Sequence, residues 1–528
     1  MRTDSLAWIA ELGVSLSFRL DGLSLLMALV VTGVGAVVLL YAGSYMKGHP
    51  RRGNLLGYLL AFLAAMLGLV LSDNLLGLFV FWEATSLLSY VLIGFEREKA
   101  EVRASALQAL LVTGGGGLAL LAGFVLLGQA GGSLEIGALA ANAEAVKASP
   151  LYLPALLLVL LGAFTKSAQV PFHFWLPDAM AAPAPVSTFL HSATMVKAGV
   201  FLLARLHPTL GGTPEWTGIV TTVGAATMLT GALLAVGQRD LKRLLAYSTV
   251  SALGSLVMLV GVGTPAALAA AMVLLLAHAL YKGALFLVAG IVDHETGTRD
   301  IASLGGLFRA LPVTAVAAAA AAFSMAGLPP LLGFVSKELL YDAALRASPA
   351  PLLLVPVAVG SNMLLVAVAL SVGWGPFTGR AGETPKAPHE APAAMWAGPL
   401  LLGLGSLAAG LFSGAISPFV SAAAAAALGR AYGVKLEVWH GFNLVLAKSL
   451  VTLVVGVALF AARGRIRSLA GRLAPIAAYG PGRLYRAGLA GLVRFAKGTA
   501  SVLSSGSLRQ DLRIVLAATV ALVAPLLL

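Results

Sequence analysis

The chain has 528 residues, of which 59% are hydrophobic and 11% charged, with a mean hydropathy of +0.93. Soluble domains are about half apolar and a quarter charged, so this composition excludes a soluble protein and indicates a polytopic membrane protein. The sequence contains no cysteine, which excludes disulfides, thiolate metal sites and cysteine-bound iron–sulfur clusters, and the net charge of +13 fits membrane topology better than nucleic-acid binding.

The first 22 residues lack the charged, apolar and small-residue pattern of a secretory signal peptide. Beyond them, apolar runs of about 20 residues predict about fourteen transmembrane helices. We expect them near 21–45, 55–72, 74–95, 104–129, 151–176, 183–206, 214–237, 244–263, 265–292, 311–345, 352–377, 394–419, 441–462 and 510–528.

Lysine and arginine are unevenly distributed between the two faces that these spans define. If the spans alternate in direction, most basic residues fall on one face, including those in 46–54, 96–103 and 463–509. Cytoplasmic loops accumulate Lys and Arg, so we expect this face to be cytoplasmic. Within 463–509, apolar side chains alternate with arginine and lysine, which favours a lateral amphipathic helix over a simple basic loop.

The predicted organisation is an all-α polytopic membrane protein without a soluble domain. We expect an N-terminal helix and cytoplasmic loop, a first five-helix repeat, a second and inverted five-helix repeat, two additional helices, the lateral helix and an anchoring helix. These occupy 1–54, 55–206, 214–377, 394–462, 463–509 and 510–528.

Charged residues inside the predicted spans are the strongest functional signal. A lysine at a helix centre costs about 2.5–3.5 kcal/mol on insertion scales, so it normally faces a partner or water. Lys166 and Lys337 lie deep in their spans, and Glu83 is the natural counter-charge for Lys166. A Glu–Lys pair whose spacing changes is a proton switch, and the alternative is a static ion pair that fixes helix packing.

Histidines accompany other intramembrane lysines. His278 and Lys282 are four residues apart in AHALYKG and therefore share one helix face. His191 and Lys197 in FLHSATMVKAG form a weaker version of this pattern. A titratable histidine beside a buried lysine favours proton relay, whereas one buried histidine alone is more often a packing residue.

Two lysines lie beside helix breakers. Lys166 precedes Pro171, and Lys337 follows the GLPPLLG segment at 327–333. Proline ends or kinks a helix, and broken helices at membrane depth border protein or a water-filled cavity. The two broken spans are the fifth and the tenth, as expected for two inverted five-helix repeats of the kind found in ion-coupled transporters.

Several motifs resemble one known family. FWEATSLLSYVLIGF, KSAQVPFHFWLPDAMAAPAPVSTFLHSATMVKAG, DLKRLLAYSTVS, AHALYKGALF and GFVSKE are similar to the antiporter-like subunits of respiratory complex I, membrane-bound hydrogenases and Mrp-type Na⁺/H⁺ antiporters. GIVDHETGTRDIASLGGL, HEAPAAMW and WHGFN resemble the large A subunit of the Mrp antiporter in particular. The resemblance covers most of the chain.

This resemblance implies roles for individual residues. Glu83 matches the family's functional glutamate, Lys166 and Lys337 its broken-helix lysines, and His191, His278 and Lys282 its central polar axis, with Lys197 beside His191. Relatives carry a further histidine where this chain has Leu274, so a longer histidine relay is not expected. Relatives also have two helices before LSFRLDGLSLL, and the large Mrp subunits continue after RQDLRIVLAATVALVAPLLL. We therefore expect a trimmed or split chain, or helices supplied by another subunit.

The sequence predicts a membrane subunit of a multi-subunit cation/proton antiporter in a prokaryotic cell membrane. On the resemblance, its partners are other membrane subunits, H⁺ and Na⁺, with K⁺ or Li⁺ as alternatives to Na⁺. It is expected to be a secondary transporter rather than an enzyme, and no motif for flavin, quinone or metal is readable. One alternative is a proton-pumping subunit of a redox complex, and another is a passive membrane scaffold.

Overall fold

A computed structural model describes residues 2–9, 14–347, 350–439, 441–477, 480–503 and 507–527. The chain divides into two compact units, Met1–Ala470 and Gly471–Leu528, which we describe separately. In the described residues 79% of the chain is helical, and the one sheet is a hairpin of β1 (Arg2–Ile9) and β2 (Val14–Leu20). No element was predicted for these first 20 residues.

The helices in the first part of the chain are α1 (Gly22–Tyr45), α2 (Arg52–Leu71), α3 (Leu75–Ile93), α4 (Ala100–Gly131), α5 (Ile136–Ala141), α6 (Ala143–Ala148), α7 (Tyr152–Lys166), η2 (Phe172–Phe174), α8 (Trp175–Asp178), η3 (Ala179–Ala181), α9 (Ala184–Thr188), η4 (Phe189–Ala193), η5 (Met195–Lys197) and α10 (Ala198–Leu210). They match the predicted spans from 21 to 206, apart from α5 and α6, which are short helices between spans.

The remaining helices of the first unit are α11 (Pro214–Val236), α12 (Leu241–Val262), α13 (Pro265–Thr296), η6 (Leu307–Arg309), α14 (Pro312–Ala326), α15 (Leu332–Leu345), α16 (Pro351–Gly373), η7 (Gly375–Phe377), α17 (Ala393–Leu411), α18 (Ser413–Leu428) and α19 (Leu444–Ala461), followed by α20 (Arg463–Ala477). The single span predicted at 394–419 falls on two helices, α17 and α18, which meet at Phe412. The second unit contains α21 (Pro481–Leu503) and α22 (Leu508–Leu527).

Among the described residues, eleven helices are long and apolar enough to cross a membrane, and α7, α14 and α18 are shorter apolar helices. The chain is therefore an all-helical, multi-pass membrane protein, whereas the count of fourteen spans stays a prediction. The segment predicted as a lateral helix forms α20 and α21, and the predicted anchor coincides with α22.

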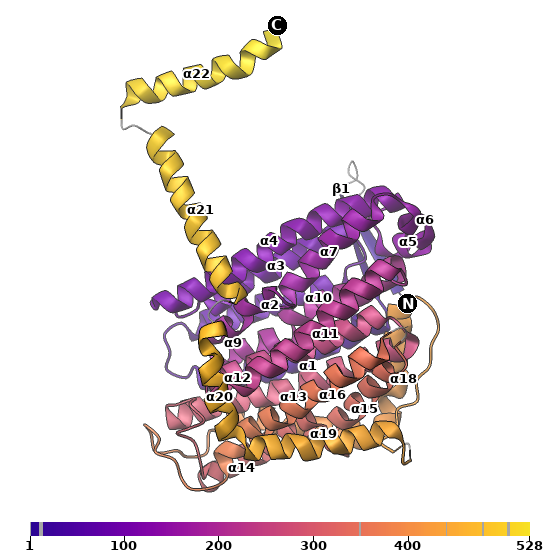
Figure 1. Ribbon diagram of the computed structural model, residues 1–528, viewed down its shortest axis with the longest axis vertical. Helices are drawn as coiled ribbons and strands as arrows, with labels where there is room; N and C mark the ends of the chain where they lie inside the picture. The colour runs from indigo at the N-terminus through magenta and orange to yellow at the C-terminus, as the bar shows by residue number, and fades with distance from the viewer. Residues whose placement is uncertain are drawn as a thin grey trace. The chain divides into compact units, whose positions relative to one another are not determined.

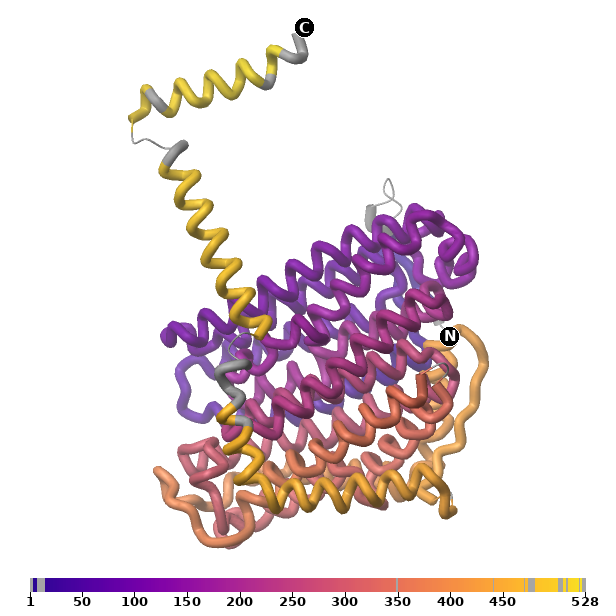
Figure 2. Tube along the Cα trace, viewed as in Figure 1, coloured from indigo at the N-terminus to yellow at the C-terminus, as the bar shows by residue number. Residues whose placement is uncertain are grey.

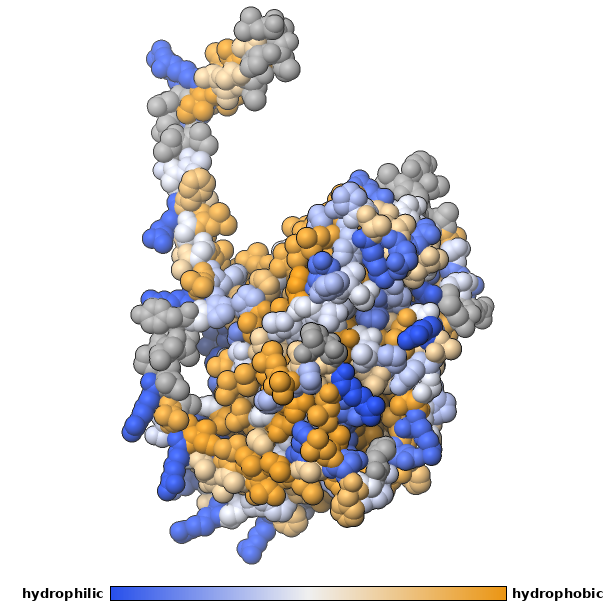
Figure 3. Space-filling view, turned by 45° about the vertical axis from the view of Figure 1, so that its right-hand side comes forward, coloured by the Kyte–Doolittle hydropathy of each residue, from blue (hydrophilic) through white to orange (hydrophobic). Residues whose placement is uncertain are grey.

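The long helices of the first unit run side by side, and their order in space broadly follows the sequence (Figures 1 and 2). α3 packs against α2 and α4, and α4 packs against α7. α13 contacts α1, α12, α14, α15 and α17, so it is the central helix of the bundle. Figure 3 shows apolar side chains over much of the face that the first unit presents there, as expected for a surface in contact with lipid.

The helix termini follow local sequence signals. Asn74 caps α3 by accepting hydrogen bonds from the backbone N–H groups of Leu76 and Gly77, at 2.9 and 3.2 Å. Asp240 caps α12 in the same way through Arg243. Both side chains satisfy backbone donors that have no partner inside their helices.

The predicted break at Pro171 is confirmed. α7 ends at Lys166, and the chain resumes as short helical turns from Phe172. Neighbouring side chains satisfy the backbone groups that the break frees: the indole of Trp175 donates to the carbonyl of Thr165 at 2.9 Å, and the backbone N–H of Val170 donates to Thr227 at 2.9 Å. The break is therefore enclosed by protein, as its position inside the bundle requires.

The second predicted break is also confirmed, between α14 and α15. Gly327 ends α14 in the left-handed conformation, with a φ of +73°, and α15 begins at Leu332. A β-carbon on Gly327 would lie 2.9 Å from the Cδ, Cε and Nζ atoms of Lys337. Glycine is required here both by its backbone conformation and by the close approach of that side chain.

A third interruption was not predicted. The span expected at 183–206 contains a π-helical turn at Phe189–Ala193, and Thr194 then leaves the helical conformation, with φ −127° and ψ −104°. The hydroxyl of Thr194 donates to the carbonyl of Phe189 at 2.6 Å. π-Helical turns of this kind are frequent at functional sites.

The hairpin is joined to the bundle by an ionic network at the ends of α1 and α10. Arg205 donates to both carboxylate oxygens of Asp21, at 2.5 and 3.0 Å, and Arg19 lies 3.4 Å from Asp21 and 3.1 Å from Asp73. Burial opposes ionisation of Asp21, but the hydrogen bonds and charge of Arg205 outweigh it and lower the pKa of Asp21 to about 2. At neutral pH the carboxyl group of Asp21 is therefore ionised, and its ion pairs connect the hairpin to α10.

Candidate functional site

Lys166, at the first break, binds the helix that carries Glu83. Its side chain is fully buried, and its ammonium donates to the carbonyl of Trp82 at 3.0 Å and to the hydroxyl of Ser86 at 2.7 Å. It also lies 5.0 Å from the centre of the Trp82 ring. The two acceptors flank Glu83 on α3, so the predicted neighbourhood of Lys166 and Glu83 is present.

Glu83 and Lys166 do not form a direct ion pair. No nitrogen–oxygen distance of 4.0 Å or less joins them, although each lies within the electrostatic influence of the other. One carboxylate oxygen of Glu83 is buried without a hydrogen-bond partner. A carboxylate and an ammonium held near each other but not in contact have room to change their spacing.

Glycines on α4 make space for this site. A β-carbon on Gly117 would overlap the Oε1 atom of Glu83, and one on Gly116 would overlap the hydroxyl of Thr165, next to Lys166. The TGGGG segment at 113–117 therefore lets α4 lie directly against both partners. Because this close approach depends on helices distant in sequence, the glycine run alone did not identify it.

His191 lies in the π-helical turn, enclosed by aromatic rings. It is fully buried, and its ring centre is 6.4 Å from that of Trp175 and 6.2 Å from that of Phe286. Neither of its ring nitrogens has a hydrogen-bond partner among the described atoms. Burial disfavours the charged form of an imidazole, so proton transfer at His191 requires water or a neighbouring side chain as a partner, and its role in a relay stays a prediction.

Lys197 binds the central helix, α13, close to His278. The ammonium of Lys197 donates to the carbonyl of Leu275 at 3.1 Å, one turn before His278 on α13. Both side chains are fully buried, and the charge of Lys197 acts on the His278 ring. The structure thus brings together two of the predicted residues that are more than 80 positions apart in sequence.

Lys282 continues the α13 face that carries His278. Its ammonium binds α12, where it donates to the hydroxyl of Ser248 and to the carbonyl of Leu245, the latter at 3.3 Å. The charge of Lys282 also acts on the His278 ring. The prediction that His278 and Lys282 share one helix face agrees with this arrangement.

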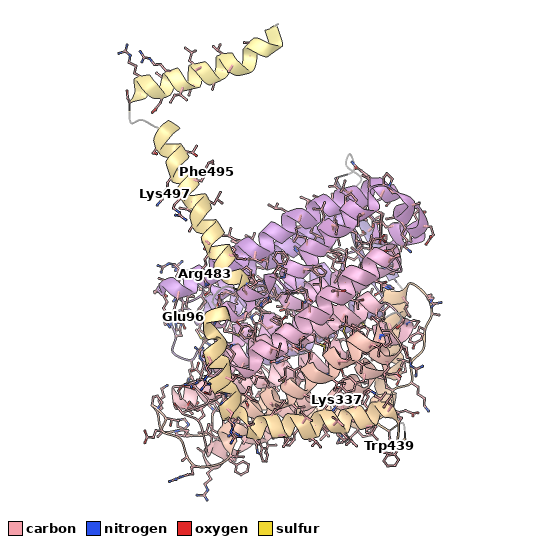
Figure 4. The ribbon with its side chains drawn as sticks, in the orientation of Figure 1. Glu96, Lys337, Trp439, Arg483, Phe495 and Lys497 are labelled. Atoms are coloured by element: carbon pink, nitrogen blue, oxygen red, sulfur yellow. The ribbon has the colours of Figure 1, made fainter. Side chains whose placement is uncertain are left out.

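Lys337 lies on α15, and its side chain reaches back to the second break. It is 5% exposed, and its ammonium donates to the carbonyl of Gly327 at 2.8 Å, with the ring of Phe334 5.7 Å away (Figure 4). The neighbouring Glu338 accepts a hydrogen bond at 2.7 Å from Ser449 on α19. The two adjacent residues therefore use different partners, in keeping with their different positions around the helix.

The four buried lysines of the predicted site share one kind of environment. Each donates to a main-chain carbonyl at a break or on a neighbouring helix, and two of them also bind a serine hydroxyl. Within the described part of the chain, none of the four is joined to a carboxylate by an ion pair; they are Lys166, Lys197, Lys282 and Lys337. A carbonyl accepts a hydrogen bond from a neutral amine as well as from an ammonium, so these lysines can lose a proton without losing every partner.

Sequence reasoning missed Lys242, which falls in the loop between the predicted spans 214–237 and 244–263. It is 2% exposed and lies in the first turn of α12, where it donates to the carbonyls of Met180 and Ala182. Asp240 is a recognisable helix cap, and that signal would have placed Lys242 inside the helix.

In the described residues, no group of three or more His, Asp or Glu side chains is arranged to hold a metal ion.

The chain matches one family over more than half its length. The profile described as "NADH:quinone oxidoreductase/Mrp antiporter, TM" matches residues 72–363, and "NADH-Ubiquinone oxidoreductase (complex I), chain 5 N-terminus" matches residues 7–54. These two matches contain all seven residues predicted from the sequence to form the site.

Curated relatives and a solved structure agree with these matches. The chain is 45% identical to a probable A/B subunit of a K(+)/H(+) antiporter of Rhizobium meliloti and 43% identical to the A subunit of a Na(+)/H(+) antiporter of Alkalihalophilus pseudofirmus, over 86% of this chain in each case. A chain in "Structure of Mrp complex from Dietzia sp. DQ12-45-1b" is similar over 99% of this chain, at 39% identity and a TM-score of 0.87.

The match does not extend over the whole of these proteins. The alignments cover 46% and 61% of the two relatives and 57% of the solved chain, so this chain spans about half to three-fifths of their length. The resemblance inferred from its motifs is nevertheless confirmed, and the chain belongs to the NADH:quinone oxidoreductase/Mrp antiporter membrane family.

Proposed function

We propose that the chain acts as an A-type membrane subunit of a multi-subunit cation/proton antiporter, and that it conducts protons through the bundle. The observation that carries this proposal is the set of buried lysines held by neutral oxygens rather than by fixed carboxylates. A structural lysine is normally neutralised by a counter-ion, because an unpaired buried charge is costly. A relay lysine must instead be able to release its proton.

The proposed path runs along the middle of the bundle. Its stations are Glu83 with Lys166, then His191 and Lys197, then His278 with Lys282, and finally Lys337. The middle of this series is supported by the bond from Lys197 to α13 and by the influence of Lys197 and Lys282 on His278. Ordered water would link stations that are not in direct contact, as in other buried polar paths.

The proposal includes the repeat architecture. The helices within 55–206 and 214–377 would form two inverted five-helix repeats, with the breaks after Lys166 and before Lys337 in equivalent places. The similar bonding at both breaks supports this architecture. Lys166 donates to the carbonyl of Trp82 on the neighbouring helix α3, and Lys337 donates to the carbonyl of Gly327 at the break itself. Paired broken helices near the membrane midplane are typical of ion-coupled transporters.

Its partners would be other membrane subunits of the complex, with H⁺ and Na⁺ as the transported ions in a prokaryotic cytoplasmic membrane. The relatives named as subunits of Na⁺/H⁺ antiporters support Na⁺, and the relative named as a probable K⁺/H⁺ subunit keeps K⁺ as the alternative. One proton moving inward across 100 mV releases about 2.3 kcal/mol, which can drive cation export.

A second candidate function is proton pumping in a redox complex. It is favoured by one observation, the match to a profile whose description includes NADH:quinone oxidoreductase. The same axis would then be driven by electron-carrying partner subunits rather than by a cation gradient.

One experiment separates the two functions. Vesicles containing the intact complex are energised with a pH gradient, and Na⁺ or K⁺ is added in the absence of any electron donor. The antiporter proposal predicts that the cation dissipates the gradient. A gradient that responds only to NADH or another reductant would establish the redox alternative instead.

A further inference from the structure

A loop crosses the end of the bundle where α13 ends and α14 begins. This segment, 378–392, joins η7 to α17 without a helix or strand of its own, and we call it the strap. Asp293 on α13 lines the same cavity as Glu96, which Figure 4 labels at the predicted cytoplasmic end. The two segments that meet here contain DHETGTRD and HE, from motifs that the proposed proton path does not use.

The strap is bonded to the end of α13 along its backbone. The backbone N–H of Lys386 donates to the carbonyl of Thr296 at 3.0 Å, and the ammonium of Lys386 donates to the carbonyl of His294, also at 3.0 Å. Further along, the N–H of Gly382 donates to the carbonyl of Gly305 at 3.2 Å. A β-carbon on Gly305 would lie 2.3 Å from a main-chain oxygen of the strap, so glycine permits this close approach.

The strap also holds the start of α14. Glu390 accepts hydrogen bonds from the backbone N–H groups of Val313 and Thr314, at 2.7 and 3.3 Å, and from the hydroxyl of Thr314 at 2.6 Å. These bonds satisfy donors that have no partner inside the helix. The strap therefore ties the end of α13 to the first turn of α14, and α14 ends at the second break, at Gly327.

A buried carboxylate and a histidine join the strap to α13. Glu295 is 4% exposed, and its Oε2 atom lies 3.3 Å from Nδ1 of His389 on the strap. Its Oε1 atom lies 2.9 Å from Nδ1 of His294. His294 is the neighbour of Glu295 on the same helix, so the contact with His389 alone crosses between the two segments. The side chain of His389 is 76% exposed and therefore open to protons from the cytoplasm.

No lysine or arginine competes for this carboxylate. Among the described residues, the basic groups within 4.0 Å of Glu295 are the two histidines. α9 and the first turns of α14 and α17 contribute no titratable side chain. The other titratable or charged groups around the contact are Tyr41 and Tyr45 on α1, Asp293 on α13, Lys386 and Glu390 on the strap, and Arg299, which pairs with Asp240.

The strength of this contact depends on the charge of the histidine. Histidine is the side chain that ordinarily changes charge between pH 5 and 8. A hydrogen bond from a charged donor to a carboxylate is roughly twice as strong as one between neutral groups. Because His389 is largely exposed, water screens part of this gain, and we expect the charged form to hold the strap about two- to fivefold more often than the neutral form.

We infer that His389 and Glu295 form a pH-sensitive clasp. At acidic cytoplasmic pH the charged His389 binds Glu295 and fastens the strap across the ends of α13 and α14. At alkaline pH the neutral ring binds more weakly, and the strap opens more often. Because α14 leads to the break that Lys337 reaches, a fastened strap should slow rearrangement of that break and hence exchange. Only this effect on exchange rests on the proposed function.

Thiol labelling of the assembled complex measures opening of the strap directly. The chain has no cysteine, so Ala391→Cys introduces a single thiol at a position of the strap that is 4% exposed. Ala387→Cys, at an exposed position of the strap, corrects for the greater reactivity of thiols at higher pH. The ratio of the two maleimide labelling rates should rise about two- to fivefold between pH 5.5 and pH 8. A constant ratio would overturn the clasp.

Two substitutions of His389 separate its charge from its size. In the Ala391→Cys background, His389→Gln cannot titrate, so the labelling ratio should be high at both pH values. His389→Lys keeps a cation at pH 8, so the ratio should stay low there. Glu295→Gln removes the carboxylate charge and should give the same flat response as His389→Gln. A full pH response in His389→Gln or Glu295→Gln would show that another group controls the strap.

His49→Gln is the matched control for loss of a histidine at this end of the bundle. His49 lies in the loop after α1, where its Nδ1 accepts from the backbone N–H of Arg51 at 3.2 Å, and it does not contact Glu295. The labelling ratio of His49→Gln should keep the full pH response. If that response is lost as completely as in His389→Gln, the effect is not specific to the clasp and the inference is wrong.

Exchange measured in vesicles tests the regulatory role of the clasp. His389→Gln should exchange at pH 6 at the rate that the parent protein reaches at pH 8, and His389→Lys should remain slow at pH 8. If both variants follow the parent rate at each pH, the clasp does not regulate exchange. Failure of the antiporter proposal would leave the labelling response intact, whereas failure of the clasp would abolish that response in a complex that still exchanges cations.

Discussion

Gly327→Ala tests whether the second break holds Lys337 in a functional position. Alanine at position 327 would have to adopt the left-handed backbone conformation of Gly327, which costs an L-residue about 1–2 kcal/mol. Its methyl group would also lie 2.9 Å from three atoms of the Lys337 side chain, so the lysine must move away from the Gly327 carbonyl that it now binds at 2.8 Å. A hydrogen bond to a charged group contributes about 1.5–3 kcal/mol. Together these effects disfavour the present geometry by ~3 kcal/mol, or more than a hundredfold in population.

The assay is cation-driven collapse of a pH gradient in vesicles, with complex assembly checked by purification. Gly360→Ala is the matched control, because Gly360 lies inside α16 and a β-carbon there meets nothing within 4 Å. Alanine at such a helix position is expected to stabilise by about 0.5–1 kcal/mol and to leave exchange unchanged. Wild-type exchange in an assembled Gly327→Ala complex would refute the view that this break positions Lys337.

Three further predictions concern topology, the first station and the ionic network. Cysteines introduced as Arg52→Cys and Gly480→Cys should react only with reagent on the cytoplasmic side, and labelling from outside would contradict the predicted orientation. Glu83→Gln should disable exchange while the complex still assembles, because a proton switch needs a carboxylate; near-normal exchange would indicate a structural glutamate. Asp21→Asn should lower the free energy of unfolding by about 2 kcal/mol at pH 7, since the pKa of Asp21 falls from 3.8 to about 2 on folding. A depressed pKa stabilises above the unfolded value, so this difference should shrink as the pH falls from 4 toward 2, and a constant difference would exclude the ionic explanation.

The sequence was sufficient for the parts of the fold that depend on local composition. Apolar runs located the long helices, and proline and glycine located the breaks beside Lys166 and Lys337, because both effects act within a few residues. The hairpin before α1 was missed although β2, VSLSFRL, alternates strictly between apolar and polar residues, which is a pattern typical of a strand. Its pairing with β1 and its ionic contact with α10 depend on residues outside that short run. The π-helical turn at His191 was missed because its backbone follows from packing rather than from a breaker residue.

The candidate site was only partly predictable for a related reason. A lysine in an apolar run is visible in a sequence, but its acceptors are not, since main-chain carbonyls such as that of Leu275 have no residue signature. The serines that accept hydrogen bonds from Lys166 and Lys282 lie on other helices, 80 and 34 residues earlier in the chain, and serine is common in membrane helices. For Lys242 the burial itself was missed, because the residue lies next to a loop in the sequence although its side chain is buried.

Exchange by Lys337→Arg is the most direct test of proton relay through the buried lysines. Lys337→Ala should abolish exchange by removing the carrier. Lys337→Arg keeps a cation at the second break and should still assemble, but exchange should remain strongly impaired because arginine does not release its proton. Both variants are measured as Na⁺-driven collapse of a pH gradient in vesicles with equal amounts of assembled complex. Wild-type exchange in Lys337→Arg would show that a fixed charge is sufficient and would contradict the proposed relay.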